Sequence, residues 1–141
     1  FDVSPYADAV FKFFLRNPIC QELGRKFKIS FSSSDQDSAL SFIHDLGFIA
    51  KQKLVDGKEV RGFKVMIAGG LGAQPRQADA LFDFLETDKI IPFLESVLRV
   101  FDRHGERNRR AKARLKHLIL NTYFLIPDPL HHLLSKLHPR P

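Results

Sequence analysis

The chain has 141 residues, of which 22 are Lys or Arg and 16 are Asp or Glu, so its formal net charge is +6. This length fits one domain that can bury a core, and the positive charge favours anionic partners such as phosphate, nucleic acid or a carboxylate-rich cofactor. No apolar run is long enough to cross a bilayer, which predicts no membrane partner. Cys20 is the only cysteine, so an internal disulfide and a metal site made of several thiolates are excluded. The chain starts at Phe1 without a signal-peptide pattern, and we expect a cytoplasmic piece of something larger.

The first predicted element is a helix over residues 4–16. Ser4 is its expected N-cap, Pro5 fits the first turn, and Asn17-Pro18 ends the helix. Its apolar stripe is expected to contain Val10, Phe13 and Phe14.

Three strands are predicted next, over residues 26–32, 46–54 and 62–68. The polar run 32–37 predicts a loop that can lead into a short helix. Asp56-Gly57 is a hairpin signal between the second and third strands. A glycine-rich loop then follows the third strand.

The remainder is predicted to be mostly helical. Thr87 or Asp88 can cap a helix that ends near His104-Gly105, and a second helix is expected over residues 107–120. The buried residues of the two helices are expected to be Ile91, Leu94, Val97, Leu98, Phe101, Ala111, Leu115, Leu118 and Ile119. Prolines after Asn121 disfavour a long helix there, so the chain divides into a domain over residues 1–120 and a Pro/His/Leu-rich tail over 121–141. The whole pattern predicts an α+β fold, with a small, mostly antiparallel sheet and helices packed against it.

The first candidate site is a pair of lysines in the first strand. Alternation directs Arg25, Phe27 and Ile29 to one side of the strand and Lys26 and Lys28 to the other. Two ammonium groups side by side repel each other, so the arrangement favours a bound anion. The alternative is a solvated strand face.

The second candidate site is the loop Gly69-Gly70-Leu71-Gly72, directly after a strand. Glycines let a backbone approach a ligand closely, and successive amides can form an anion-binding nest. The spacing matches neither a dinucleotide fingerprint nor a P-loop, and a plain tight turn is the alternative.

The third candidate site is the segment 103–116, in which seven Lys or Arg residues gather around an expected helix start. Helical spacing would place Arg107, Arg110 and Arg114 on one face, and Arg109, Lys112 and Lys116 on another. Basic side chains are disfavoured at a helix N-terminus, which suggests a nearby anionic group. A solvated basic helix and a nucleic-acid surface are the alternatives, and the lack of interleaved aromatic residues disfavours nucleic acid. Of the scattered histidines, His44 next to Asp45 could form a catalytic pair on paper, but a structural histidine is favoured.

Taken together, these blocks resemble one half of a sirohaem-dependent nitrite or sulfite reductase. The resemblance covers roughly residues 2–120. Its ordered blocks are 4–10, 14–18, 25–31, 44–50, 62–65, 68–72, 75–76, 98–105 and 109–116.

The resemblance implies a fold in which two similar halves surround a sirohaem coupled to a 4Fe-4S cluster, and a six-electron reduction of sulfite or nitrite. It implies that Lys26 and Lys28 contact the bound anion. It also implies that the macrocycle and its eight carboxylates meet residues of the other blocks, namely Arg25, Gly69, Gly70, Gly72, Arg109, Lys112 and Arg114. Fixed positive charge suits this task, and ammonium groups can deliver protons as oxygen leaves.

The chain also departs from the family pattern. The family's cluster-binding cysteines, spaced C-x5-C and C-x3-C, belong to the other half, so a 4Fe-4S cluster is expected only through that missing half. The expected protein partner is a cysteine-bearing second half or an electron-donor protein. Cys20 lies in the wrong block, and the family's triple glycine appears as Ala68-Gly69-Gly70. The isolated chain is therefore expected to be inactive. A tetrapyrrole- or anion-binding module without catalysis, and a basic domain associated with nucleic acid, remain alternatives.

Overall fold

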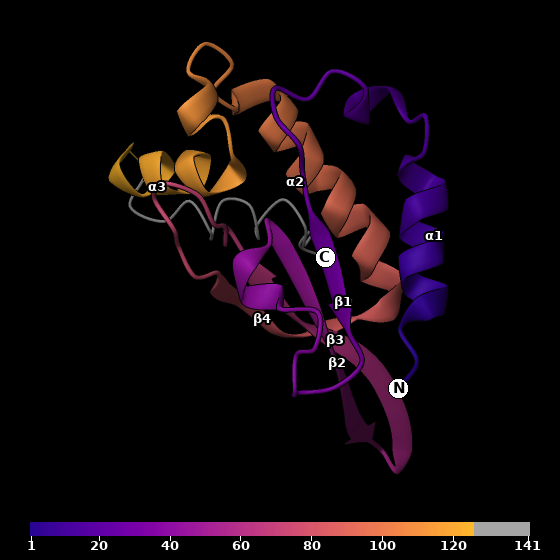
Figure 1. Cartoon of the computed structure of the whole chain (residues 1–141). Coiled ribbons are helices and arrows are strands. Elements are labelled where there is room, and N and C mark those ends of the chain that lie inside the picture. Colours follow the sequence, from indigo (N-terminus) through magenta and orange to yellow (C-terminus); the bar gives the residue numbers. More distant parts are fainter. Residues whose placement is uncertain (126–141) are drawn as a thin grey trace.

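A computed structural model of the chain describes the backbone of residues 1–125 and the side chains of residues 1–120. Its main elements are α1 (Ser4–Phe14), β1 (Ile29–Ser32), β2 (Leu46–Val55), β3 (Lys58–Ile67), β4 (Asp79–Glu86), α2 (Ile90–His104) and α3 (Leu115–Leu125). Short 3-10 turns join them, namely η1 (Pro18–Cys20), η2 (Ser41–Ile43), η3 (Thr87–Lys89) and η4 (Arg110–Lys112). The architecture is α+β, as predicted (Figure 1).

The four strands form one sheet in the order β1-β2-β3-β4. β1 pairs with β2 in parallel, and the β2–β3 and β3–β4 pairs are antiparallel, which confirms the mostly antiparallel sheet. Asp56 and Gly57 form the predicted hairpin, and both have positive φ, at 52° and 75°. This geometry is favoured in two-residue hairpins because its twist matches that of the strands.

One face of the sheet forms the core against α2. The register pairs Leu46 with Ile67, Phe48 with Val65 and Ala50 with Phe63, so alternate residues of both strands point to the same side. All six are buried, together with α2 residues Ile90, Phe93, Leu94, Val97 and Phe101, Val10 of α1 and Leu115 of α3.

The other face of the sheet is partly covered by η2. A Cβ on Gly47 would lie 2.3 Å from Ser41 Cβ, so only glycine permits this contact. Ser30 and Ser32 of β1 are buried on the same face, where the Ser30 hydroxyl hydrogen-bonds the Ser41 hydroxyl at 3.4 Å. The two faces therefore differ in character, one packed with phenylalanine and the other with small polar residues.

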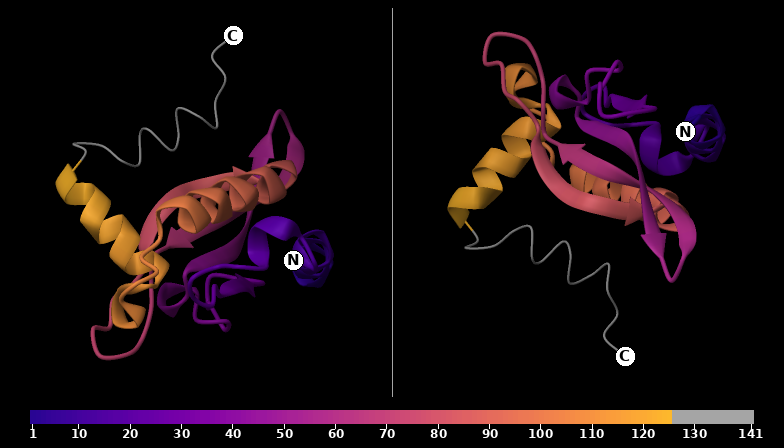
Figure 2. Two further views of the ribbon diagram at one scale, coloured as in Figure 1. Left: turned by 90° about the horizontal axis from the view of Figure 1, so that it is seen from above. Right: turned by 90° about the horizontal axis from the view of Figure 1, so that it is seen from below.

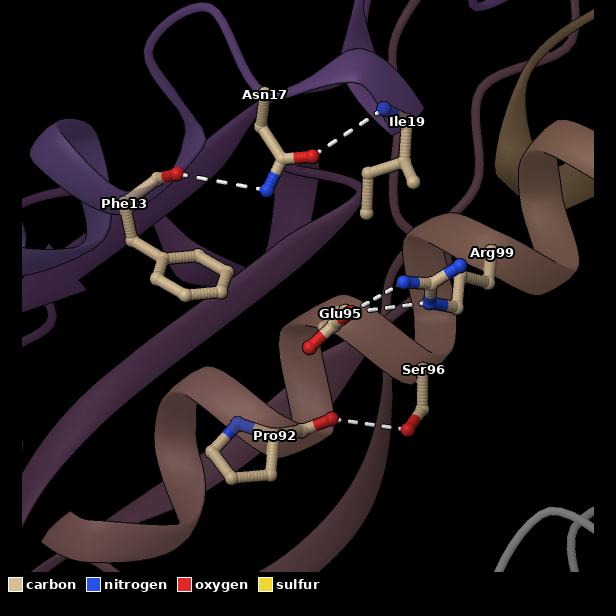
Figure 3. Close-up of polar contacts among 7 residues, drawn as sticks. All are labelled: Phe13, Asn17, Ile19, Pro92, Glu95, Ser96 and Arg99. Carbon is tan, nitrogen blue, oxygen red and sulfur yellow. Dashed lines mark hydrogen bonds and ion pairs between the residues drawn. The ribbon is translucent and has the colours of Figure 1, made fainter.

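The helices flank the sheet at defined places. α2 lies across one face of the sheet, and α3 lies at the end of the domain opposite the tip of the β2–β3 hairpin (Figure 2). Helix α1 ends at Phe14, two residues before the predicted end at residue 16, and Asn17 caps η1 instead: its Oδ1 accepts from the Ile19 N–H, and its Nδ2 donates to the Phe13 carbonyl (Figure 3). On the exposed side of α2, Glu95 pairs with Arg99 and the Ser96 hydroxyl donates to the Pro92 carbonyl.

Several element boundaries differ from the sequence predictions. The N-cap residue of α1 is Val3 rather than the predicted Ser4, which is the first residue of the helix. The Asp2 carboxylate accepts a hydrogen bond from the Ser4 N–H at 2.9 Å. Phe13 is 40% exposed, so it lies outside the apolar stripe of α1. β4 was not predicted, because the apolar residues Leu81, Phe82, Phe84 and Leu85 have a spacing that also suits a helix.

The predicted helix over 107–120 is also wrong at both ends. Helix α3 begins at Leu115, after a loop and η4, and continues to Leu125 past Asn121. Adjacent positive charges at a helix N-terminus would oppose its dipole. The segment is instead a loop with one 3-10 turn, in which Arg107 pairs with Asp102 and Arg114 pairs with Asp45. The helical faces predicted for this segment therefore do not exist. The tail predicted over 121–141 lies mostly outside the described residues.

Candidate anion-binding site

The two lysines of the first candidate site precede β1 rather than forming part of it. The strand begins at Ile29, yet the predicted alternation extends back through residue 25: Phe27 packs on Phe101 of α2, with ring centroids 5.5 Å apart, while Lys26 and Lys28 are exposed. Among residues 1–120, no carboxylate lies within ion-pair distance of either ammonium group. Both charges are therefore open to an anion from solvent.

Asp45 connects this lysine segment to the other two candidate sites. Its side chain is fully buried, and it accepts from the Lys28 backbone N–H at 2.8 Å and from Arg114 at 3.2 Å (Nε) and 2.6 Å (Nη2). Its backbone carbonyl accepts from the Ala68 N–H at 2.8 Å, at the start of the glycine loop. One residue thus holds three segments that lie far apart in the sequence.

The glycine loop packs closely on η2 and α3. A Cβ on Gly69 would lie 2.4 Å from the Phe42 carbonyl oxygen, and a Cβ on Gly70 would lie 3.2 Å from Lys116 Cδ. Gly72 has a φ of 108° and open space around it. Ala68 has a φ of 68°, a left-handed backbone that glycine adopts at lower cost. Gly69 is therefore explained by packing within the chain, and Gly72 by its backbone conformation.

Two basic side chains hold the loop from within. The buried ammonium of Lys116 donates to the carbonyl oxygens of Leu71 at 3.0 Å and Gln74 at 2.6 Å. Burial lowers the pKa of Lys116 from its ordinary value, and the charge of Arg114 lowers it further. Arg76 donates to the Ala68 carbonyl and forms paired backbone hydrogen bonds with Gly70. The loop is thus held by contacts within the chain.

The rest of the basic segment faces solvent. Arg109, Arg110 and Lys112 are exposed, and Arg25 donates to the Arg110 carbonyl oxygen at 3.4 Å, which places this segment beside the lysine segment. A cavity of about 300 Å³ opens here, and its lining includes Arg103, His104, Arg107, Asn108, Lys112 and Leu118. Hydrogen bonds from the Asn108 and Arg109 N–H groups lower the pKa of the Glu106 carboxyl at the same place. The surface is therefore dominated by cationic groups.

Through Asp45, the structure thus brings together Lys28, Arg114 and the glycine loop. It also places Arg25 next to Arg110. It places Arg109 and Lys112 on the exposed surface of the same basic segment, near η4. Sequence reasoning missed the functions of Asp45, Lys116 and Arg76 as internal supports. The sequence pairs Asp45 only with its neighbour His44, but the Nδ1 of His44 lies 2.8 Å from the Leu40 carbonyl oxygen, at the start of η2.

The described residues offer no set of ligands for a metal or a cluster. No group of three or more His, Cys, Asp or Glu side chains gathers anywhere in the described part of the chain. Burial, followed by the nearby charge of Asp102, raises the pKa of the Cys20 thiol above its ordinary value, which disfavours the thiolate that metals bind. Within the same residues, no helix is both long and apolar enough to cross a bilayer.

The fold and the site together define an α+β domain whose cationic residues are organised around a buried carboxylate. Over residues 1–122 the sequence matches the family described as "Nitrite and sulphite reductase 4Fe-4S domain". The chain belongs to this family, as its sequence pattern predicted.

Relatives with curated descriptions include both kinds of reductase. The chain is 33% identical over 104 residues to the sulfite reductase (NADPH) hemoprotein beta-component of Chromohalobacter salexigens, covering 69% of this chain and 17% of that protein. It is also 33% identical over 97 residues to the assimilatory ferredoxin-dependent nitrite reductase of Haloferax mediterranei, covering 67% of this chain and 17% of that protein.

A solved structure also resembles this fold. The NirA protein of Mycobacterium tuberculosis matches with a TM-score of 0.77 and 26% identity, over 97% of this chain and 23% of the NirA chain. The chain therefore spans about one sixth of the length of the curated relatives and less than a quarter of the NirA chain.

Proposed function

We propose that this chain supplies the anion-binding and sirohaem-facing part of a sulfite or nitrite reductase. The observation that supports this most is the buried Asp45, which joins the lysine segment, the glycine loop and the basic segment into one unit. Each of these three segments is independently a candidate for contact with anions. Their connection through one carboxylate favours a single shared site over three unrelated solvated surfaces.

In this proposal Lys26 and Lys28 bind the oxyanion. Their ammonium groups are exposed and unpaired with carboxylates among the described residues, so a small anion can accept charge-assisted hydrogen bonds from them without breaking an internal ion pair. When an oxygen atom of the anion leaves as water, it takes up two protons, and an ammonium within hydrogen-bond distance is a suitable donor. Lys26 and Lys28 therefore both hold the substrate and supply protons to it.

The residues of the basic segment fit a polycarboxylate macrocycle. Arg109 and Lys112 are exposed beside the cavity of the basic segment, and Arg25 lies near them through its contact with Arg110. Leu71, at the tip of the glycine loop, is 65% exposed and offers an apolar contact for a ring face. Arg114 acts differently, because its guanidinium is committed to Asp45. When bound, sirohaem supplies the redox-active iron of the site.

A 4Fe-4S cluster does not fit this chain. The single cysteine, Cys20, cannot replace a set of thiolates, and its raised pKa disfavours the thiolate further. We therefore assign no step to the cluster within these residues. The proposal needs a cysteine-bearing partner or segment for electron delivery.

The first test is a titration of the purified chain with sirohaem, followed through the Soret band. The double variant Lys26→Ala/Lys28→Ala is expected to bind sulfite or nitrite about thirtyfold more weakly or worse, since it removes two charge-assisted contacts that contribute at least about 1 kcal/mol each. A control that removes two lysines elsewhere is Lys12→Ala/Lys58→Ala. Lys58 begins β3 and pairs with Val55, at the end of β2 that lies about 30 Å from residue 46 at the usual rise per residue.

Two outcomes would contradict the proposal. One is the absence of a Soret shift with the wild-type chain together with salt-sensitive binding to generic DNA, which would indicate a nucleic-acid surface. The other is equal anion affinity in the two double variants. A chain that binds sirohaem, but restores no reduction when mixed with a cysteine-bearing reductase half, would be a binding module without catalysis.

A further inference from the structure

Asp45 lies in the connection between η2 and β2, and its carboxylate is fully buried. Burying a charge is costly unless it is paired and hydrogen-bonded. Here both carboxylate oxygens are used: one accepts from Arg114 Nε, and the other accepts from Arg114 Nη2 and from the Lys28 N–H. Only 16% of the Arg114 side chain is exposed, so this pair lies inside the protein.

The Lys28 N–H has no strand partner of its own. Parallel pairing begins at Ile29 with Leu46, one residue after Lys28 and one residue after Asp45. The carboxylate of Asp45 therefore provides the acceptor for Lys28, while the Lys28 carbonyl accepts from the Leu46 N–H at 3.2 Å. Both peptide groups of Lys28 are thus held, which determines the side of the sheet to which its side chain projects.

The bidentate contact with Arg114 also matters for the charge of the site. A lone carboxylate next to the Lys28 backbone would attract the ammonium group and compete with an incoming anion. Arg114 balances the charge of Asp45, so the carboxylate can hold the Lys28 backbone while the Lys28 ammonium stays exposed. This arrangement separates the anchoring of the lysine from its charge.

We infer that Asp45 is a positioning residue that, balanced by Arg114, sets the direction of Lys28 toward the anion. This inference rests on the proposed function, because it assigns a task to Asp45 within the same site. It also changes the task expected of Arg114, whose guanidinium acts on the carboxylate of Asp45 rather than on a ligand.

The test compares Asp45→Ala and Asp45→Asn with Asp37→Asn as a matched control. Asp37 is also a carboxylate that accepts from a backbone N–H, that of Ser41, and from a hydroxyl, that of Ser32, but it contacts neither Lys28 nor Arg114. Asparagine at position 45 retains an acceptor for Lys28 and is the variant expected to fold if alanine does not. Each variant is measured well below its own melting temperature.

Two readouts are needed. The first is the hydrogen-exchange rate of the Lys28 amide. It is divided by the rates of amides in the β2–β3 ladder, which corrects for changes in global stability. Asp45→Ala is expected to raise the Lys28 rate about tenfold or more, and Asp37→Asn is expected to leave it unchanged. The second is sirohaem and sulfite affinity in a double-mutant cycle with Lys28→Ala. If Asp45 acts through Lys28, Asp45→Ala should weaken sulfite binding when Lys28 is present, whereas the double variant Asp45→Ala/Lys28→Ala should bind within about twofold of Lys28→Ala alone.

The outcomes are distinct. If the wild-type chain binds sulfite and sirohaem but the effects of the two substitutions multiply, or Asp45→Ala leaves the Lys28 amide protected, the inference is wrong and the proposed function stands. If the wild-type chain binds neither ligand, the proposed function fails and no positioning task remains for Asp45. Faster exchange at Lys28 together with a non-additive cycle supports the inference.

Discussion

Replacing Gly69 by alanine tests whether the glycine loop is shaped by packing inside the chain or by a ligand. The added Cβ would lie 2.4 Å from the Phe42 carbonyl oxygen and 2.9 Å from the His44 carbonyl oxygen, where contacts below 3.0 Å essentially never occur. Both neighbours are backbone atoms of the η2 region and cannot rotate away. The loop must therefore move off η2, which strains the hydrogen bond from the Gly69 N–H to the His44 carbonyl at 3.0 Å.

The expected cost follows from these contacts. Overpacking costs about 1–3 kcal/mol, and loss of one backbone hydrogen bond adds about 1 kcal/mol, so Gly69→Ala should lower the free energy of unfolding by about 2–4 kcal/mol. For a chain of this size each kcal/mol corresponds to about 3–4 °C, so the melting temperature should fall by about 6–16 °C.

The measurement is thermal and urea unfolding of the ligand-free chain, followed by circular dichroism. Gly70→Ala is the matched control, because its Cβ would come no closer than 3.2 Å to another atom, the side-chain Cδ of Lys116, and it should cost less than about 1 kcal/mol. Equal stability of Gly69→Ala and Gly70→Ala would refute the packing argument. A cost at Gly69 that appears only in the presence of sirohaem would refute it as well, and would indicate close approach of a ligand.

Three further predictions concern buried or partly buried ionisable groups. Lys116→Met removes the two hydrogen bonds to the loop carbonyls, so the amides of residues 71–74 should exchange with solvent about tenfold faster or more. Unchanged exchange rates would show that the ammonium group does not hold the loop. Burial raises the pKa of Asp37, but hydrogen bonds from the hydroxyl of Ser32 and the N–H of Ser41 outweigh it and leave the pKa below its ordinary value of 3.8. Asp37 therefore stabilises the fold above about pH 4 and loses this contribution as the pH falls through its lowered pKa, so Asp37→Asn should flatten the acid limb of stability against pH, and an unchanged limb would contradict this. Burial, then the charges of Lys116 and Lys112, lower the pKa of His117 below 6.5, so the unfolded chain takes up this proton first and stability should fall as the pH drops below about 6.5. His117→Gln should reduce that fall in urea unfolding at pH 7 and pH 5, and an equal fall in both proteins would argue against a buried neutral imidazole.

Local chemistry in the sequence was sufficient for much of the fold. The β2–β3 hairpin was predicted from Asp56-Gly57, whose positive φ values are local properties of those residues. The spacing of Leu94, Val97, Leu98 and Phe101 predicted the buried face of α2. Ile90 and Phe93 are buried there as well, whereas the predicted Ile91 is only partly buried. The family could also be predicted, since it depends on the order of short blocks along the chain.

Two of the larger failures arise because contacts outside the segment itself override its local preference. β4 exists because its backbone pairs with β3, and its apolar spacing suits a helix equally well. The helix expected from residue 107 is displaced because Arg107 and Arg114 find carboxylates elsewhere, in α2 and before β2. Neither partner can be inferred from the basic segment itself.

The sequence alone determined which side chains around the site are cationic and, through alternation, predicted that Lys26 and Lys28 lie on the same side of their segment, where both are exposed. Only the tertiary structure decided which of the charges remain available. Arg114 and Lys116 lie in the same basic run as Arg109 and Lys112, yet the first two bind Asp45 and the glycine loop while the last two face solvent. The physical reason is that burial requires a partner for every charge, and those partners lie 42 to 69 residues away along the chain.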